Sequence, residues 1–235
     1  MSKDSSEGIL YIVSVPIGNL ADITARAKSI LSEVDIIACE DTRVTGKLLS
    51  KLSIEDKPAL RSYRDENELA LADSIVGMIK GGHKIALVSD AGTPAISDPG
   101  FRLIKACRKE GVPVTALPGA CALVNALALS GLPTDAFLFA GFLPPKRSAR
   151  ERFLKENAEQ NHTLVVYESC HRIEKFLEDI ISVLGSDRVI SICREMTKMH
   201  ESVLTGSAES VQKKLLSGSK KGEFVVCIAK QSFNI

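Results

Sequence analysis

The feature that most restricts the fold is a regular alternation of short apolar runs and amphipathic segments through the first half of the chain. Amphipathic segments such as 65–80 place apolar residues at helical spacing. The runs between them are almost continuously apolar, as expected for strands buried on both faces, and they lie at 9–16, 35–40, 84–89 and 112–118. Strands that alternate with helices pair in parallel through crossover connections, so the sequence predicts an α/β fold.

The same pattern begins again after the turn-forming segment GLPTD (131–135), with strands predicted at 137–144, 163–169, 188–195 and 223–230. We therefore expect two α/β domains with a ligand cleft between them, since clefts between domains are common binding sites. The predicted organisation is a disordered tail (1–8), a first domain (9–118), a connecting segment (119–135) and a second domain (136–235).

Composition excludes several classes of protein. The net charge of the 235 residues is +1, so nucleic acid could bind only at a local basic patch. The six cysteines form no C-x-x-C pair and the four histidines no H-E-x-x-H motif, which predicts reduced thiols and no metal site. The start, MSKDSSEG, lacks the apolar region of a signal peptide, and 120–132 is too short to cross a bilayer. We expect a cytoplasmic protein.

Three loops rich in Gly and Pro each follow a predicted buried strand: VPIGNL (15–20), SDAGTPAISDPG (89–100) and LPGACA (117–122). The carboxyl ends of parallel strands share one edge of a sheet, where ligands bind, and small residues allow a ligand to approach the backbone. Asp90 either accepts hydrogen bonds from a ligand or pins the loop, whereas Asp98 is predicted to cap a helix that runs to Lys109. No phosphate loop and no G-x-G-x-x-G fingerprint is present.

Three further segments each contain several charged or reactive side chains close together. The run 144–155 is strongly basic, and it is either a solvated helix face or a footprint for phosphates. The segment CREMTKMHES (193–202) is either an exposed polar loop or a site of proton transfer and phosphate contact. In YESCHR (167–172), Cys170 and His171 are adjacent, but adjacency alone does not make a nucleophile and its base.

Taken in order, these strings resemble the ribosomal RNA small subunit methyltransferase I family over residues 9 to 230. The motifs that carry the resemblance are VPIGNLADIT, EDTRVTGKLL, LVSDAGTPAISDPG, LPGACA, LPTDAF, GFLPPK, YESCHR, REMTK and KGE. The resemblance implies the tetrapyrrole-methylase fold, S-adenosylmethionine (SAM) in the cleft, and a homodimer. The implied reaction is methylation of the 2′-hydroxyl of a cytidine ribose in 16S rRNA. The partner that carries this ribose would be either the free small-subunit rRNA or the 30S subunit.

One part of the sequence departs from that family. Members usually carry a His-x-His-Asn-Glu string, but here the region reads YRDENE (63–68) and retains only Asn67 and Glu68. Ala120 also replaces a proline that is frequent in the family. Any role that depends on the two histidines is therefore absent from this chain.

The resemblance also implies roles for individual residues. From the first domain the cofactor would contact Pro16, Ser89, Asp90, Ala91, Gly92, Thr93, Ile96 and Ser97, and Ala120 and Cys121 of the connecting segment would flank it. From the second domain it would contact Tyr167, Glu168, Gly222 and Glu223. A ribose hydroxyl is a weak nucleophile, so a base or a cation beside it would help. We assign that work to Glu195 and Lys198, with Arg194 holding a phosphate. The predicted RNA-binding residues are Lys146, Arg147, Arg150 and Arg152.

Two other functions fit the same residues. A tetrapyrrole C-methyltransferase would share the fold and the cofactor, although the basic run at 144–155 argues against it. A non-catalytic RNA-binding module would keep the fold without needing to hold SAM. A nucleotide hydrolase is disfavoured, because neither a phosphate loop nor a set of metal-binding carboxylates is present.

Overall fold

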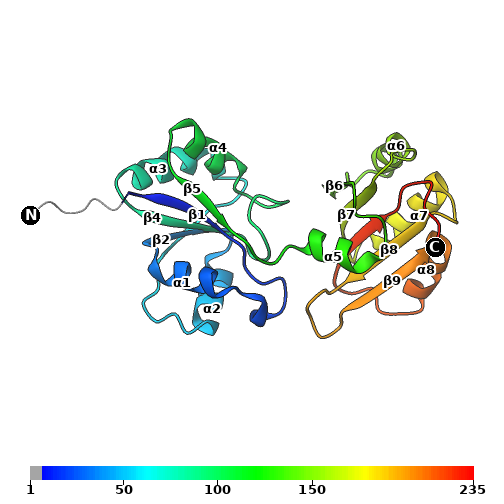
Figure 1. The fold of residues 1–235 in the computed structure, drawn as a ribbon, viewed down its shortest axis with the longest axis horizontal. Coiled ribbons are helices and arrows are strands. Elements are labelled where there is room, and N and C mark those ends of the chain that lie inside the picture. Colours follow the sequence, from blue (N-terminus) through cyan, green and yellow to red (C-terminus); the bar gives the residue numbers. More distant parts are fainter. Residues whose placement is uncertain (1–6) are drawn as a thin grey trace, which may run out of the picture. The chain divides into compact units, whose positions relative to one another are not determined.

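A computed structural model describes residues 7–235, which divide into two compact units (Figure 1). The first unit ends at Cys121 and the second is Ala122–Ile235. Residues 1–6 of the predicted disordered tail lie outside the described residues, whereas Gly8 is buried against the backbone of Ile79 and His83. The predicted connecting segment, 119–135, contains helix α5 (Ala122–Ser130), which is part of the second unit.

The first unit is built on a five-stranded sheet in the order β3-β2-β4-β1-β5. Every strand pair in it is parallel, which confirms the α/β prediction. The strands are β1 (Ile9–Val13), β2 (Ile36–Cys39), β3 (Ala59–Ser62), β4 (Lys84–Val88) and β5 (Val114–Leu117). The central strands β2 and β4 are almost wholly buried, as their continuous apolar runs require.

Helices cover both faces of this sheet (Figure 1). On one face, α1 (Ala25–Glu33) and α2 (Thr42–Lys51) pack on a core that includes Leu31 and Leu49. On the other, α3 (Glu68–Lys80) and α4 (Phe101–Lys109) pack on a core that includes Ile79 and Leu103. The residue that caps α1 is Thr24, whose Oγ1 accepts a hydrogen bond from the Ala27 N–H.

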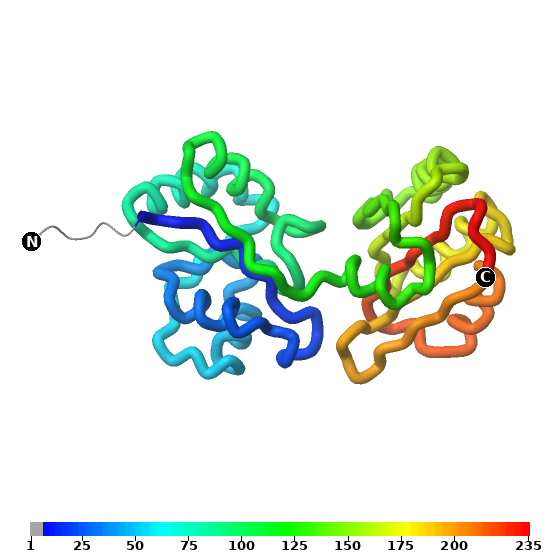
Figure 2. Tube along the Cα trace, viewed as in Figure 1, coloured from blue at the N-terminus to red at the C-terminus, as the bar shows by residue number. Residues whose placement is uncertain are grey.

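The second unit contains a mixed sheet in the order β6-β7-β10-β8-β9. Only β6 and β7 are parallel, and the other three pairs are antiparallel. Its strands are β6 (Phe137–Phe142), β7 (Thr163–Ser169), β8 (Val189–Arg194), β9 (Ser202–Ser207) and β10 (Glu223–Ile228). Figure 2 shows the chain turning back between β8 and β9 through a hairpin that carries residues 195–201.

The helices of the second unit also lie on both faces of their sheet. The main core is formed by α6 (Arg147–Glu156), α7 (Ile173–Leu184) and α8 (Ala208–Leu216), packed on residues such as Ile192 and Val226. Helix α5 lies on the opposite face, where the Cys193 thiol contacts the Ala126 carbonyl oxygen. Across residues 7–235, no helix is both long and apolar enough to span a membrane.

The six cysteines are all free thiols. Four are buried, and burial raises the pKa of Cys107 and Cys193 to about 11 and that of Cys227 to about 12. Such thiols stay protonated and are poor nucleophiles. No group of three or more His, Cys, Asp or Glu side chains within the described residues is arranged to hold a metal ion.

Candidate functional site

The three Gly- and Pro-rich loops meet at the carboxyl edge of the first sheet. Val15 and Gly92 exchange two backbone hydrogen bonds of 2.9 and 3.0 Å. The Thr93 hydroxyl lies 3.0 Å from the Ser14 hydroxyl and donates to the Ala120 carbonyl oxygen at 3.0 Å. The structure therefore places the loops that carry Pro16, Gly92 and Ala120 against one another, on one rim of one unit.

Close packing explains why two of these positions are glycine. Gly119 approaches Ser14 so closely that a Cβ on it would lie 2.6 Å from the Ser14 Cβ. Gly92 has φ +77°, in the left-handed region, where other residues are strained. Together these glycines let the loops interlock.

The exposed part of the rim is formed by Asp90, Ala91, Ile96 and Ser97. The Ser89 hydroxyl is buried and donates to the Ala91 carbonyl oxygen. Asp90 uses Oδ1 to accept a hydrogen bond from the Asp41 N–H at 3.0 Å. Within residues 7–235 its Oδ2 accepts none, and the residue is exposed, so one oxygen pins the loop and the other is free to accept a hydrogen bond from a ligand.

Asp98 does not cap α4, contrary to the sequence-based prediction. The helix begins after Gly100, which has φ +143° and no side chain with which to cap. Asp98 is half-buried instead, and burial together with the nearby Glu40 carboxylate raises its pKa to about 6, although a hydrogen bond with Ser89 opposes the shift. The Asp90 and Asp65 carboxylates act in the same direction as Glu40.

The cap of α4 comes from another helix. Glu68, the first residue of α3, is 5% exposed, and its Oε1 accepts the N–H groups of Gly100 and Arg102, both at 2.9 Å. Asn67 closes the preceding turn, since its side chain accepts the Arg64 N–H and donates to the Ser62 carbonyl oxygen. Both residues retained from the family's His-x-His-Asn-Glu string therefore hold the fold around the 89–100 loop.

The titration of Asp98 makes stability depend on pH. Its pKa in the folded protein is above the ordinary value of 3.8, so the folded protein binds this proton more tightly than the unfolded chain does. The contribution of Asp98 to stability is complete below about pH 4 and is lost as the pH rises through about 6.

Replacing Asp98 with Asn should therefore increase the melting temperature, relative to the wild type, progressively between about pH 4.5 and about pH 7.5. Thermal denaturation across this range measures the difference, with exposed Asp56→Asn as the control; parallel curves for wild type and Asp98→Asn would rule the effect out.

In the second unit, the predicted catalytic residues come together where β8 ends beside the start of β10. Glu195 Oε1 accepts the Lys198 ammonium at 2.9 Å and the Glu223 N–H at 3.0 Å. Lys198 also pairs with the Glu223 carboxylate at 2.9 Å. Gly222 has φ +114°, and a Cβ there would lie 2.5 Å from the Glu195 side chain, so this glycine lets the two segments meet.

The electrostatics of this cluster fix the charges that it carries. Burial disfavours the charged form of Glu195, but hydrogen bonds from Lys198 and the Glu223 backbone outweigh it and lower the pKa of Glu195. Burial likewise disfavours the charged form of Lys198, but bonds to Glu223 and Glu195 raise its pKa. Both groups are ionised at neutral pH. Lys198 is therefore suited to act as a cation, and Glu195 is a weak base that holds Lys198 in place.

Arg194 is engaged by its own unit. All three guanidinium nitrogens donate within it: Nε to the Lys221 carbonyl oxygen at 2.6 Å, Nη1 to the His200 carbonyl oxygen and Nη2 to the Ser219 hydroxyl. These contacts tie the β8–β9 hairpin to the segment that precedes β10. Arg194 therefore stabilises the segments that carry Glu195, Lys198 and Glu223.

Tyr167 and Glu168 end strand β7. The Tyr167 hydroxyl accepts the Leu123 N–H at 3.1 Å, and its ring makes edge contacts with Phe139 and Phe142. Glu168 is 2% exposed and its carboxylate accepts the Ser169 N–H and the Arg172 guanidinium. The Glu168 carboxylate is thus engaged within its own unit.

The basic run 144–155 divides into two kinds of residue. Lys146, Arg147 and Arg152 are exposed. Arg150 is only 4% exposed and pairs with Asp179 of α7 at 2.7 Å, so it belongs to the core and is withdrawn from the predicted RNA-binding set. Arg147 also pairs with Glu151 and Asp179, which reduces the net charge that this surface offers.

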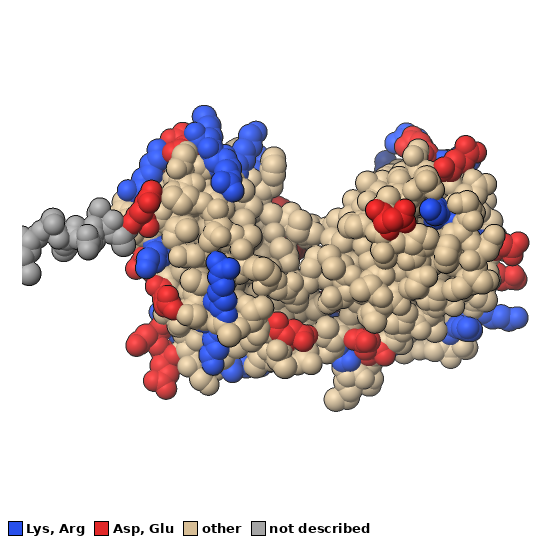
Figure 3. All heavy atoms as spheres, in the orientation of Figure 1, with Lys and Arg blue, Asp and Glu red and all other residues tan. Residues whose placement is uncertain are grey.

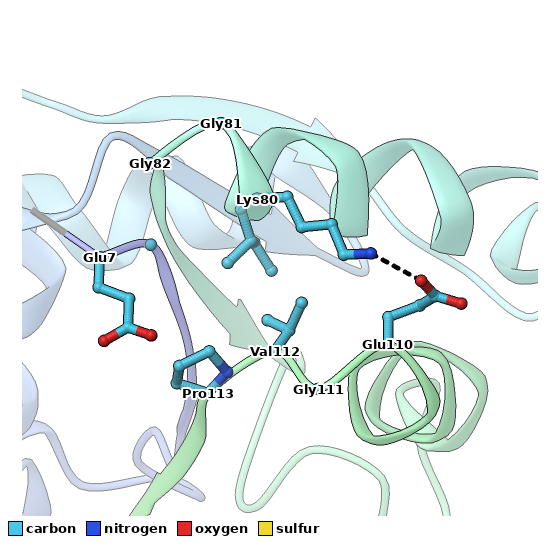
Figure 4. A pocket seen from close by; sticks show the side chains of 10 residues that line it. Glu7, Lys80, Gly81, Gly82, Glu110, Gly111, Val112 and Pro113 are labelled. Atoms are coloured by element: carbon cyan, nitrogen blue, oxygen red, sulfur yellow. Dashed lines mark hydrogen bonds and ion pairs between the residues drawn. The ribbon is translucent and has the colours of Figure 1, made fainter. Parts of the chain in front are cut away.

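A different hollow, of about 590 Å³, lies at the opposite edge of the first sheet (Figure 4). It is formed where β1, β4 and β5 begin and is lined by Gly8, Gly82 and Gly111, beside a Lys80–Glu110 ion pair of 2.6 Å. None of the predicted site residues lines it. The predicted site residues of the first unit therefore do not include the lining of this hollow.

Sequence reasoning missed Glu68 and Asp179, which act across helices. Neither has a local signal, because Glu68 contacts a backbone 32 residues away and Asp179 a side chain 29 residues away. Ser14 could have been found, since a hydroxyl directly after a buried strand and before a proline turn is a natural partner for the loops of a shared rim.

Comparison with known proteins identifies the fold family. The family model for tetrapyrrole (corrin/porphyrin) methylases matches residues 9–212. Among solved structures, the chain is similar to the methyltransferase CobJ (TM-score 0.70, 17% identity, 97% of this chain and 96% of the other). It is also similar to uroporphyrin-III-C-methyltransferase from Thermus thermophilus (TM-score 0.63, 19% identity, 95% of each chain). At these identities the likeness establishes the fold.

Curated relatives are much closer in sequence. The chain is 49% identical to ribosomal RNA small subunit methyltransferase I of Haemophilus influenzae, over 94% of this chain and 78% of that protein. It is 48% identical to the protein of the same name from Escherichia coli O157:H7, over 86% of this chain and 70% of that protein. The chain therefore belongs to the tetrapyrrole methylase family and, within it, to the ribosomal RNA small subunit methyltransferase I family.

Proposed function

We propose that the protein is a SAM-dependent methyltransferase that methylates the 2′-hydroxyl of a cytidine ribose in small-subunit ribosomal RNA. The observation that carries this proposal is the identity of 45–49% to proteins named ribosomal RNA small subunit methyltransferase I, over most of the chain. The tetrapyrrole methylases with solved structures are only 17–19% identical, so they favour the fold but not their own substrates.

The rim of the first unit suits SAM. The cofactor carries a sulfonium and an ammonium, both cationic, and the exposed Asp90 carboxylate of the rim keeps one oxygen without a hydrogen bond among residues 7–235. The small side chains of Ala91, Gly92 and Ala120 allow a nucleoside to lie against the backbone. We expect Pro16, Ser89, Thr93, Ile96, Ser97 and Cys121 to complete this surface, and Tyr167, Glu168, Gly222 and Glu223 to contribute from the second unit.

When bound, SAM supplies a methyl group on sulfur that is open to in-line displacement. The ribose hydroxyl must give up its proton to solvent as its oxygen forms the new bond to the methyl carbon and the bond from that carbon to sulfur breaks. The work of the protein is then to orient the hydroxyl and to stabilise the negative charge on its oxygen as the proton leaves. The Lys198 ammonium is suited to the second task, because Glu195 and Glu223 hold it in one position and keep it protonated. Arg194 positions that cluster through its bonds to Lys221 and Ser219.

Replacing Lys198 with alanine should lower the single-turnover rate of methylation by roughly 100-fold, the usual cost of removing one preorganised electrostatic contact. The affinity for SAM should change little, because Lys198 is assigned to the substrate oxygen and not to the cofactor. Lys198→Arg should retain part of the rate. An alanine variant with wild-type turnover would remove Lys198 from the reaction.

Replacing Asp90 with alanine should weaken SAM binding at least tenfold in calorimetry. The loss of its hydrogen bond to Asp41 should cost the fold only about 1 kcal/mol, since a single exposed hydrogen bond contributes about that much. Asp65→Ala removes a nearby exposed carboxylate that is not assigned to the cofactor, and it should leave affinity unchanged. Equal affinities of the Asp90→Ala protein and the wild type would place the cofactor elsewhere.

Two alternatives predict different substrates. A tetrapyrrole C-methyltransferase would transfer the labelled methyl group of SAM to uroporphyrinogen, and a non-catalytic RNA-binding module would transfer it to nothing. We expect incorporation into 30S subunits and none into uroporphyrinogen. Incorporation into the porphyrinoid alone would overturn the proposal.

We further propose a cytoplasmic location and a homodimer. The location follows from the substrate, because ribosomal RNA is made and assembled in the cytoplasm of bacteria, and the homodimer follows from the family resemblance. The exposed Lys146, Arg147 and Arg152 remain candidates for contact with RNA phosphates. Their contribution should be modest, because Arg147 is already paired with two carboxylates.

A further inference from the structure

Helix α4, which directly follows the 89–100 loop, has a chemically uniform outward face. At 100° per residue, Arg108, Phe101, Lys105, Lys109 and Arg102 fall in that order within an arc of about 120°. All five are exposed. The opposite side of the helix is completely buried through Leu103 and Cys107, so the orientation of the arc toward solvent is fixed by the core.

This arc is a concentration of uncompensated positive charge. It holds four cations and no carboxylate, in a chain whose net charge is only +1. Among residues 7–235, Lys105, Arg108 and Lys109 are in no ion pair, and Arg102 makes one long contact of 3.5 Å with Glu68. Glu110, just beyond the helix, is paired with Lys80. Figure 3 shows the basic side chains gathered over α4.

The basic run on α6 is weaker by comparison. There Arg150 is buried and Arg147 is paired, which leaves Lys146, Arg152 and Lys155 beside Glu151 and Glu156. Of these two helices, α4 therefore carries the more strongly basic surface. The sequence pattern does not single it out, because the cations of α4 are interleaved with its buried residues.

An exposed aromatic ring lies at the end of α4 nearest the loop. Phe101 is 67% exposed, although it is the first residue of a well-packed helix. The ring is therefore accessible for stacking on a ligand. Proteins that bind single-stranded RNA combine cations that contact phosphates with aromatic rings on which bases stack. Phe101 and the four cations form that combination, next to the loop assigned to SAM.

We propose that the outward face of α4 binds the RNA substrate, with the cations on its phosphates and Phe101 stacked on an unpaired base. This inference rests on the proposed function and adds an RNA-binding surface to it. An anionic membrane is the less suitable partner, because the arc carries a single apolar side chain and membrane-surface helices need an apolar face to insert. The apolar face of α4 is already buried in the protein.

The test compares two matched double variants. Lys105→Gln/Lys109→Gln removes two cations from the arc, and Lys213→Gln/Lys214→Gln removes two exposed cations from α8. Binding to 30S subunits is measured between about 50 and about 200 mM salt. The α4 variant should lower the slope of log affinity against log salt by about 1.4, or 0.7 for each lost phosphate contact, and weaken binding roughly tenfold. The α8 variant should match the wild type, and both should bind SAM normally.

Phe101 is tested separately. Phe101→Ala should weaken binding to 30S subunits by roughly fivefold or more without changing the salt slope, and Phe101→Tyr should restore it, since either ring can stack. If the Lys105→Gln/Lys109→Gln variant bound 30S subunits with the salt slope and affinity of the wild type, the inference would be overturned. It would also be overturned if this variant lost binding to phosphatidylglycerol vesicles but kept wild-type binding to 30S subunits. If the wild type itself neither binds nor methylates 30S subunits, the proposed function fails; if it does both while the α4 variant is unaffected, only this inference fails.

Discussion

Replacing Asp179 with alanine is expected to destabilise the second unit by about 3–5 kcal/mol, the usual cost of breaking a buried ion pair from one side. Asp179 is 1% exposed and accepts the Arg150 guanidinium at 2.7 and 2.8 Å. Without it, the buried Arg150 would keep only its bond to the Pro145 carbonyl oxygen. A charge left unpaired in the core is costly because water cannot reach it.

Urea denaturation measures this effect, with Glu178→Ala as the control because Glu178 is the exposed neighbour of Asp179 on α7. The double variant Arg150→Leu/Asp179→Leu should recover most of the lost stability, since it leaves no unpaired charge. If Asp179→Ala lost less than about 1 kcal/mol, Arg150 would have to reach solvent, and its place among the predicted RNA-binding residues would be open again.

Replacing Glu68 with alanine should cost about 3 kcal/mol of stability. The variant leaves the N–H groups of Gly100 and Arg102 without an acceptor, and each buried unsatisfied group costs about 1–3 kcal/mol. It also removes a negative charge from the positive end of the α4 dipole. The 89–100 loop depends on this anchor, because Ala95 and Ser97 have φ of +67° and +62°, a strained conformation for residues other than glycine.

Hydrogen exchange gives the most specific measurement of this anchor. In the Glu68→Ala protein, the amides of Gly100 and Arg102 should exchange much faster, while amides in β8 and β10 should not change. Glu68→Gln keeps an acceptor oxygen and should lose less stability, and exposed Glu66→Ala should lose almost none. Unchanged exchange at Gly100 and Arg102 would mean that the loop is held by its own contacts.

The sequence predicted most of the first unit because its folding signals are local. Strands such as 84–89 are buried on both faces, so their apolar runs are continuous and easy to identify. The convergence of the three loops on one rim then follows from parallel pairing alone. One helix start was predicted wrongly. Helix α4 is capped not by Asp98 but by Glu68 from another helix, which no local pattern could reveal.

The second unit was less predictable. Strand β9 and helix α8 were not predicted, because Ser202–Ser207 mixes polar residues with a glycine and only pairing with β8 makes it a strand. The antiparallel pairs of this sheet also depend on tertiary contacts. The cluster of Arg194, Glu195 and Lys198 was predicted as a group, but its internal bonds, which make Lys198 a fixed cation, required the coordinates.

The predicted RNA-binding surface changed the most. A run of basic letters indicated α6, yet the fold buries Arg150 and pairs Arg147 there. On α4 the cations are separated in sequence by Leu103, Ile104 and Cys107 and become a single surface only when the helix forms. The number of basic residues in a run of sequence is therefore a poor guide to the charge that an amphipathic helix exposes on its surface.

The central claim, that this protein methylates a ribose in small-subunit rRNA with SAM, is tested most directly by mapping methylated riboses. 30S subunits are incubated with SAM and the protein, and their rRNA is then cleaved by alkali, which spares the bond after a 2′-O-methylated residue. We expect one new protected position, at a cytidine, that requires both SAM and the protein and fades with Lys198→Ala. A map identical to that of untreated subunits, with SAM bound and the protein folded, would contradict it.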